Sequence, residues 1–234
     1  MHIMLPVMQF LRDSRANAAR CAKNQILPHV TICSKSYCCV VAPTRRDHVS
    51  EKLGFSEMVQ VVWFKRDLRV QDHAPLAAAA ANAGPVLPLL IVEPQYWAQP
   101  DMAARHYAFW RENADSLAAS LERIGLQLIV RVGAAVDVLA AIHGQTSITA
   151  LHSHMETGNA WTFERDKLVG AWCAANDVPW HQPRQFGVVR PFNNRNRWAS
   201  QWEDFMTAPT VDAPTEASMA KGFDSEPLPD AHGL

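Results

Sequence analysis

The chain has 234 residues, enough for one full domain or one domain with appendages, and its hydrophobic content of 48% is sufficient for a core. Its formal net charge of −1 is unevenly divided, because residues 1–57 hold 8 Lys/Arg and 4 Asp/Glu, net +4, whereas residues 58–234 hold 14 and 19, net −5. An acidic globular part argues against generic binding to the DNA phosphate backbone, and no apolar run approaches the length of a membrane span. We therefore expect little or no DNA binding and no membrane insertion.

The first 57 residues lack the apolar periodicity of a folded domain. Their opening MHIMLPVMQFL is too short for a signal peptide, and the positive charges follow it instead of preceding it. The basic residues that follow resemble an organellar presequence: Arg12, Arg15, Arg20 and Lys23. Alternatively, translation starts at Met58 and the upstream residues are misassigned coding sequence. On either interpretation residues 1–57 are an unstructured or misassigned extension.

The cysteines indicate the compartment. Four of the five precede residue 58, and only Cys173 lies in the patterned part of the chain. They form no paired C-x-x-C elements with metal-ligand spacing, and a core of this size needs no disulfide. A reducing, cytoplasmic location is therefore expected.

From Met58 onward, predicted strands and helices alternate. Short runs rich in apolar residues predict five strands, at 59–64, 86–92, 126–132, 147–151 and 178–181. Periodic apolar residues predict helices between them, at about 73–83, 101–124, 134–143 and 157–176, with Asp72 and Asp101 as candidate N-caps. This alternation predicts an α/β fold with a doubly wound, five-stranded parallel sheet. Ligands in such sheets bind beyond the carboxyl ends of the strands.

The sequence changes character after the fifth strand. A loop and a short helix carry Phe186, Trp198 and Trp202, and residues 207–234 are rich in Pro, Ala, Ser and acidic residues without apolar periodicity. We therefore expect an α/β domain at 58–206, followed by a linker or disordered tail at 207–234.

Four strings in the predicted domain carry a family resemblance. They are WFKRDLR followed by D-H-x-P-L (63–76), I-V-E-P-x-x-W (91–97), H-S-H-M-E-T-G-N-x-W-T-x-x-R-D (152–166) and F-G-V-V-R-P (186–191). Together they resemble the N-terminal, Rossmann-like α/β domain of the photolyase/cryptochrome family. The resemblance implies an antenna chromophore of folate or deazaflavin type, with FAD bound only by a second, helical domain. It also implies a role in light-driven DNA repair or blue-light sensing.

The resemblance ends inside the linker, before the FAD-binding domain. We therefore expect the chain to be truncated, to lack deoxyribodipyrimidine photolyase activity by itself, and to self-associate or dock to a helical FAD domain. Two alternatives remain open: a free-standing nucleotide- or chromophore-binding module, and an interaction domain for a separate helical FAD domain.

Candidate antenna-binding residues lie at the predicted strand ends. The first loop supplies Arg66, Asp67 and Arg69, which either border the antenna pocket or form an ion-pair network that braces the loop. Glu93 follows the second strand. In folate-type relatives the segment after the fourth strand supplies a carboxylate to the pterin, which would place Glu156 and Asn159 in the pocket. Alternatively, Thr157 or Asn159 caps the next helix and Glu156 complements its dipole.

The H-x-H pair after the fourth strand raises the question of a metal site. His152 and His154 share a face of an extended strand, but no third ligand with suitable spacing is nearby. We predict no catalytic residues in this chain and no metal site.

Overall fold

The computed structural model of the chain describes residues 58–189 and 194–230, which fall within one compact unit, Lys52–Leu234. The predictions for residues 1–57 and for the last four residues of the tail lie outside the described residues. No helix in the described parts of the chain combines the length and apolar character needed to cross a membrane.

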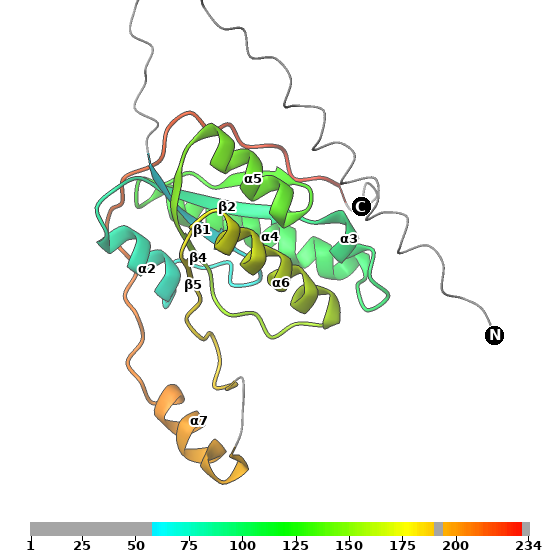
Figure 1. Ribbon diagram of the computed structural model, residues 1–234, viewed down its shortest axis with the longest axis vertical. Coiled ribbons are helices and arrows are strands. Elements are labelled where there is room, and N and C mark those ends of the chain that lie inside the picture. The colour runs from blue at the N-terminus through cyan, green and yellow to red at the C-terminus, as the bar shows by residue number, and fades with distance from the viewer. Residues whose placement is uncertain (1–57, 190–193, 231–234) are drawn as a thin grey trace, which may run out of the picture. The chain divides into compact units, whose positions relative to one another are not determined.

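The sheet has five strands, all parallel, in the order β3-β2-β1-β4-β5 (Figure 1). The strands are β1 (Val59–Phe64), β2 (Val86–Val92), β3 (Ile129–Val132), β4 (Ile148–His152) and β5 (Trp180–His181). The predicted α/β fold with a five-stranded parallel sheet is confirmed. Because β2 and β4 flank β1 on opposite sides, the strand order reverses direction between β1 and β4.

Helices cover both faces of the sheet (Figure 1). Along β1, Val59, Val61 and Trp63 enter one core cluster and Val62 and Phe64 the other, as the two-residue period of a strand requires. The first cluster packs against α5 (Ala135–Gln145) and α6 (Ala160–Ala175), and the second against α2 (Ala74–Ala81) and α4 (Ala104–Glu122). A short helix, α3 (Pro94–Trp97), precedes α4, and α7 (Trp198–Met206) follows the sheet.

Two predicted helix starts are wrong. Asp72 has a left-handed backbone with φ of 50°, and its carboxylate accepts a hydrogen bond from the Val211 N–H. The imidazole of His73 caps α2 instead, because its Nδ1 accepts a hydrogen bond from the Leu76 N–H at 3.1 Å. Asp101 also caps no helix, since α4 begins at Ala104 after the separate turn of α3.

The segment after α7, for which the sequence predicts a linker or disordered tail, makes backbone contacts with the domain. Residues 211–230, here called the C-terminal strap, contain no helix or strand, yet their backbone bonds to the domain. Ser218 and Ala220 bond to Val86 of β2, and Glu226 bonds to Val130 of β3. Ala220 is 2% exposed. Because these contacts are hydrogen bonds between backbone groups, they require no periodic pattern of apolar residues in the sequence.

Candidate functional site: the carboxyl edge of the sheet

The candidate site lies where the strand order reverses. In open parallel sheets this reversal opens a crevice at the carboxyl ends of the strands, where ligands bind. Here the loops after β1 and β4 are adjacent across the reversal, and contacts between their side chains join them. Three groups of residues occupy this edge: a cluster around Asp67, an ionic network around Arg165, and an aromatic pocket between the β1 loop and α4.

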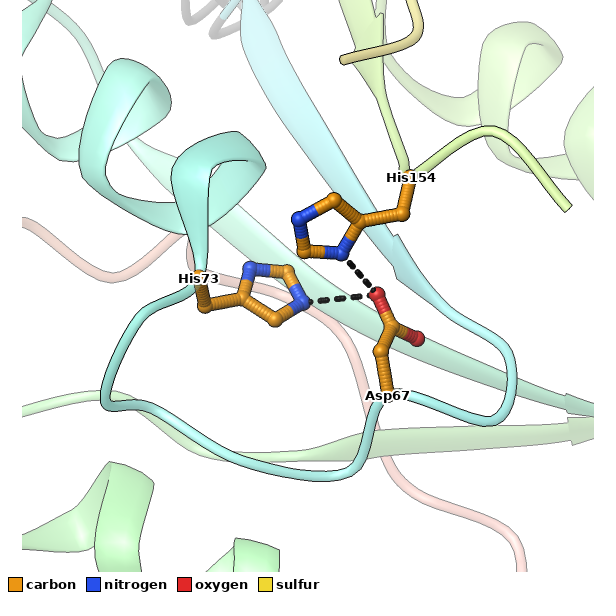
Figure 2. Close-up of side chains that lie close together, drawn as sticks. All are labelled: Asp67, His73 and His154. Carbon is orange, nitrogen blue, oxygen red and sulfur yellow. Dashed lines mark hydrogen bonds and ion pairs between the residues drawn. The ribbon is translucent and has the colours of Figure 1, made fainter. Parts of the chain in front are cut away.

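Asp67 is the centre of the first group (Figure 2). Its side chain is buried, and Oδ2 accepts hydrogen bonds from His73 Nε2 at 2.9 Å and His154 Nδ1 at 2.6 Å. Its Oδ1 accepts the Lys65 backbone N–H at 2.9 Å. Burial by itself would raise the pKa of Asp67, but the hydrogen bonds from His154 and His73 hold it well below its ordinary value. A buried carboxylate thus joins the loops after β1 and β4 to the start of α2.

The hydrogen bonds fix the position of the proton on His73. Its Nδ1 accepts from Leu76 and carries no proton, so Nε2 carries the proton donated to Asp67. Burial also lowers the pKa of His73, which favours this neutral form.

Nitrogen and oxygen atoms of Asp67, His73 and His154 lie within 4.8 Å of one another, close enough to hold a metal ion. The residues do not fit that use, because His73 would have to lose its remaining proton while Nδ1 still caps α2. The arrangement instead fits a structural joint built from hydrogen bonds.

Arg165 of α6 is the centre of the second group. It is 9% exposed, and its guanidinium donates to Glu93 Oε2 at 2.8 Å, to Asp166 Oδ1 at 2.9 Å and to Glu156. Burial would lower the pKa of Arg165, but these carboxylates raise it above its usual value. Burial also raises the pKa of Glu93, although Arg165 opposes this. Arg165 therefore ties the ends of β2 and β4 to α6.

Lys65 and Arg66 connect this network to the β1 loop. Lys65 Nζ lies 3.2 Å from Asp166 and 3.9 Å from Glu156, and burial lowers its pKa. Arg66 Nε lies 3.1 Å from Glu156 Oε1, and the Arg66 side chain is 46% exposed. Lys65 and Arg66 thus carry the network from the β4 loop to the rim of the third group.

The third group forms a pocket of about 560 Å³, here called the β1–α4 pocket. Its lining includes Arg66, Arg69, Tyr96, Trp97, Met102 and Phe109. The aromatic rings support one another, since Trp97 lies 5.0 Å from Tyr96 and 5.4 Å from Trp110 between ring centroids. The indole N–H of Trp110 donates to the Lys65 carbonyl at 2.9 Å, which anchors α4 to the β1 loop. The pocket offers flat apolar faces with two cations at its rim.

The sequence-predicted residues divide among these groups. Arg66 and Arg69 line the β1–α4 pocket, while Arg66 also joins the ionic network that contains Glu93 and Glu156. Asp67 is turned away into the histidine cluster. Arg66 and Arg69 thus line a pocket and also form ion pairs, with Glu156 and Asp72 respectively, whereas Asp67 accepts hydrogen bonds from two histidines.

Of the two candidate caps for the helix after β4, Thr157 and Asn159, the structure shows Asn159 as the N-cap of α6. Its Oδ1 accepts the Thr162 N–H at 3.1 Å at the start of α6, and its amide donates to Asp101 at 2.9 Å. Gly158 makes this turn possible, because a Cβ there would lie 2.2 Å from Thr162 Oγ1. The Glu156 carboxylate near the start of α6 is not free, because it forms ion pairs with Arg66 and Arg165.

Sequence reasoning missed several residues at this edge. Arg165 lies inside a helix, where nothing in the pattern separates it from solvent-facing arginines. The joint of His73 and His154 with Asp67 spans 87 positions of sequence and leaves no local signal. The bulky side chains between 96 and 109 could have been recognised as a pocket, because they follow directly after the end of β2.

Comparisons with known proteins place these features in context. Residues 60–197 match the family model described as DNA photolyase. A deoxyribodipyrimidine photo-lyase of Salmonella typhimurium is 43% identical over 115 residues, 47% of this chain and 24% of the relative. A cryptochrome DASH of Gloeobacter violaceus is 31% identical over 112 residues, 45% of this chain and 22% of the relative. The matches thus span about a quarter of the relatives' length.

Solved structures share the fold. A cryptochrome of Synechocystis sp. superposes with a TM-score of 0.63 at 18% identity, covering 74% of this chain and 40% of that one. A class III photolyase of Agrobacterium tumefaciens gives 0.59 at 19% identity, covering 76% and 39%. An archaeal photolyase of Sulfolobus tokodaii, solved with two FAD molecules, gives 0.56 at 21% identity, covering 70% and 38%.

Proposed function

Because the chain belongs to the DNA photolyase family, we propose that its α/β domain binds a light-absorbing antenna chromophore, of folate or deazaflavin type, in the β1–α4 pocket. The excitation would pass to an FAD bound by a helical domain of the kind found in the family. The observation that supports this most directly is an aromatic pocket with two arginines at the edge where parallel sheets bind ligands.

The size and chemistry of the pocket suit such a ligand. Its volume of about 560 Å³ is within the range of small-molecule sites. Tyr96 and Trp97 can stack on a planar heteroaromatic ring, and Asp101 can accept a hydrogen bond from a ring N–H. Arg66 and Arg69 can pair with the carboxylates or phosphates that such chromophores carry. The ionic network holds Arg66 in place through Glu156.

The test is reconstitution of the purified chain with a reduced folate, a deazaflavin or FAD, followed by absorption and fluorescence spectroscopy. We expect the folate or the deazaflavin to be retained with a shifted spectrum. A Trp97→Ala change should weaken binding about tenfold, since it removes a stacking face. Phe163→Ala is the matched control, because Phe163 is a 54% exposed aromatic on α6 outside the pocket lining.

Two results would contradict the proposal. One is that no chromophore is retained by the folded chain. The other is that the Trp97 and Phe163 variants lose the chromophore equally, which would place it outside the pocket.

A further inference from the structure

A second hollow lies on the other side of the β1 loop. It has a volume of about 820 Å³ and runs between the residues after β5, the start of α2 and the apolar side of α7; we call it the α7 groove. Its lining includes His154, Arg184, Phe186, Trp198, Trp202 and Phe205. The β1–α4 pocket shares only Arg69 with it, so the two are separate sites.

His154 contributes a buried polar side chain to the lining of this groove. The residue is 4% exposed, and its Nδ1 is committed to Asp67, so Nε2 is the nitrogen left for other partners. Figure 2 shows Nε2 turned away from Asp67. No partner for it is found among residues 58–189 and 194–230, and His154 lines the groove. In the neutral imidazole, Nε2 is a hydrogen-bond acceptor held in a fixed orientation.

Arg184 and Arg69 give the groove its charge. The guanidinium of Arg184 stacks over Phe205 at 5.0 Å, and no carboxylate pairs with it in the described parts of the chain. Arg69 is 39% exposed and lies 3.9 Å from Asp72, the single acidic residue of the lining. The carboxylate of Asp72 also holds the Val211 N–H. The lining therefore has more positive than negative charge, although the domain as a whole is acidic.

Aromatic rings form the opposite wall. Trp198 and Trp202 are stacked with their centroids 6.3 Å apart, and they are 50% and 42% exposed. Gly187 fixes this wall, because a Cβ there would lie 2.4 Å from Trp202 Cδ1. The indole thus rests directly on the backbone of the segment after β5. Large half-exposed rings of this kind offer stacking faces to any nucleobase.

We propose that the α7 groove binds a nucleoside phosphate, with the base on the tryptophan wall, a base amino group on His154 Nε2 and the phosphate at Arg184. Each part of such a ligand meets a group suited to it: a flat ring, a hydrogen-bond acceptor and an unpaired cation. The groove is also larger than the β1–α4 pocket, which we assign to the antenna chromophore.

The test uses the full chain and three probes: AMP, adenosine and ribose 5-phosphate, with binding followed by tryptophan fluorescence and calorimetry. We expect AMP to bind most tightly, because it alone engages both wall and arginine. Arg184→Met should reduce AMP affinity about tenfold, to the level of adenosine. Arg123→Met, which removes an exposed arginine at the end of α4, should leave it unchanged.

Further variants separate this site from the antenna pocket. Trp198→Ala should weaken AMP and adenosine alike, whereas Trp97→Ala should weaken only the chromophore. Loss of AMP binding in the Trp97 variant would overturn the proposal, because AMP would then occupy the β1–α4 pocket.

Three other outcomes would also overturn it: equal affinity for AMP and ribose 5-phosphate, an Arg184 variant that binds AMP normally, and self-association through the groove that AMP does not disperse. The last would identify the groove as a protein-docking surface.

Discussion

Acid should destabilise the domain through His152. This residue ends β4, is 2% exposed, and neither of its ring nitrogens has a hydrogen-bond partner among residues 58–189 and 194–230. Its ring stacks on His181 with centroids 4.9 Å apart. Burial, together with the charge of His181, lowers the pKa of His152 to about 4. In the unfolded chain a histidine has a pKa of about 6.5.

The sign and size follow from linkage. Between pH 6.5 and 4 the unfolded chain binds the proton and the folded chain does not, so the free energy of unfolding falls as the pH falls. The stability due to neutral His152 is fully present above pH 6.5. The loss is about 2 kcal/mol at pH 5 and approaches about 3 kcal/mol below pH 4.

The assay is urea unfolding at pH 7.5, 6 and 5 for the native chain and for His152→Leu. Between pH 7.5 and pH 5 the free energy of unfolding should fall by about 2 kcal/mol less in the variant than in the native chain. At pH 7.5 the substitution should be neutral or stabilising, because it removes two buried nitrogens that have no hydrogen-bond partner in the described parts of the chain. His106→Leu, which removes an exposed histidine, is the control and should keep the native slope. If the His152 variant keeps the same slope, the imidazole is not held neutral by burial.

Three further outcomes are expected. Arg165→Met should cost about 3 kcal/mol in urea unfolding, because Glu93 loses its buried partner, and it should also weaken chromophore retention; unchanged retention would separate the network from the pocket. Asn159→Ala should lower the free energy of unfolding by about 1 kcal/mol through loss of the α6 cap, with Asn159→Ser restoring most of it. Gly187→Ala should displace Trp202 and change the near-ultraviolet circular dichroism while leaving the urea midpoint almost unchanged; an unaltered spectrum would show that α7 does not rest on this residue.

The central strands of the sheet could be predicted from sequence because both of their faces are buried. Runs such as 59–64 and 86–92 are apolar almost throughout, and their bounds agree with the structure. The stripe on the long helix was also predictable, since Trp110, Ala114 and Leu117 recur at helical spacing and are buried.

Helix starts were less predictable, because capping depends on geometry that several residue types can meet. Asp72 has the preferred chemistry, yet its left-handed backbone turns the carboxylate toward the C-terminal strap. A histidine cap at position 73 has no comparable preference to reveal it.

The sequence could predict where the candidate site lies, but not which of its side chains form ion pairs with one another. Strand ends correctly placed Arg66, Glu93 and Glu156 at one edge of the sheet. Arg165, the shared partner of Glu93 and Glu156, comes from a helix, and no spacing rule connects it to the strand ends that carry these two carboxylates. Long-range ion pairs follow from how elements pack, which a single sequence does not display.

The C-terminal strap has a consequence for the outer edge of the sheet. β3 is the last strand on its side, and Val130 and Val132 turn their N–H groups outward. Ser225 and Glu226 accept those hydrogens, and the Glu226 N–H returns one to the Val130 carbonyl. A protein trimmed after Met206 would bare this row of donors and acceptors, which is a template for strand pairing between molecules. Among the described strands, the opposite edge strand β5 has only two residues, so the strap covers the longer of the two edge strands and hinders such pairing there.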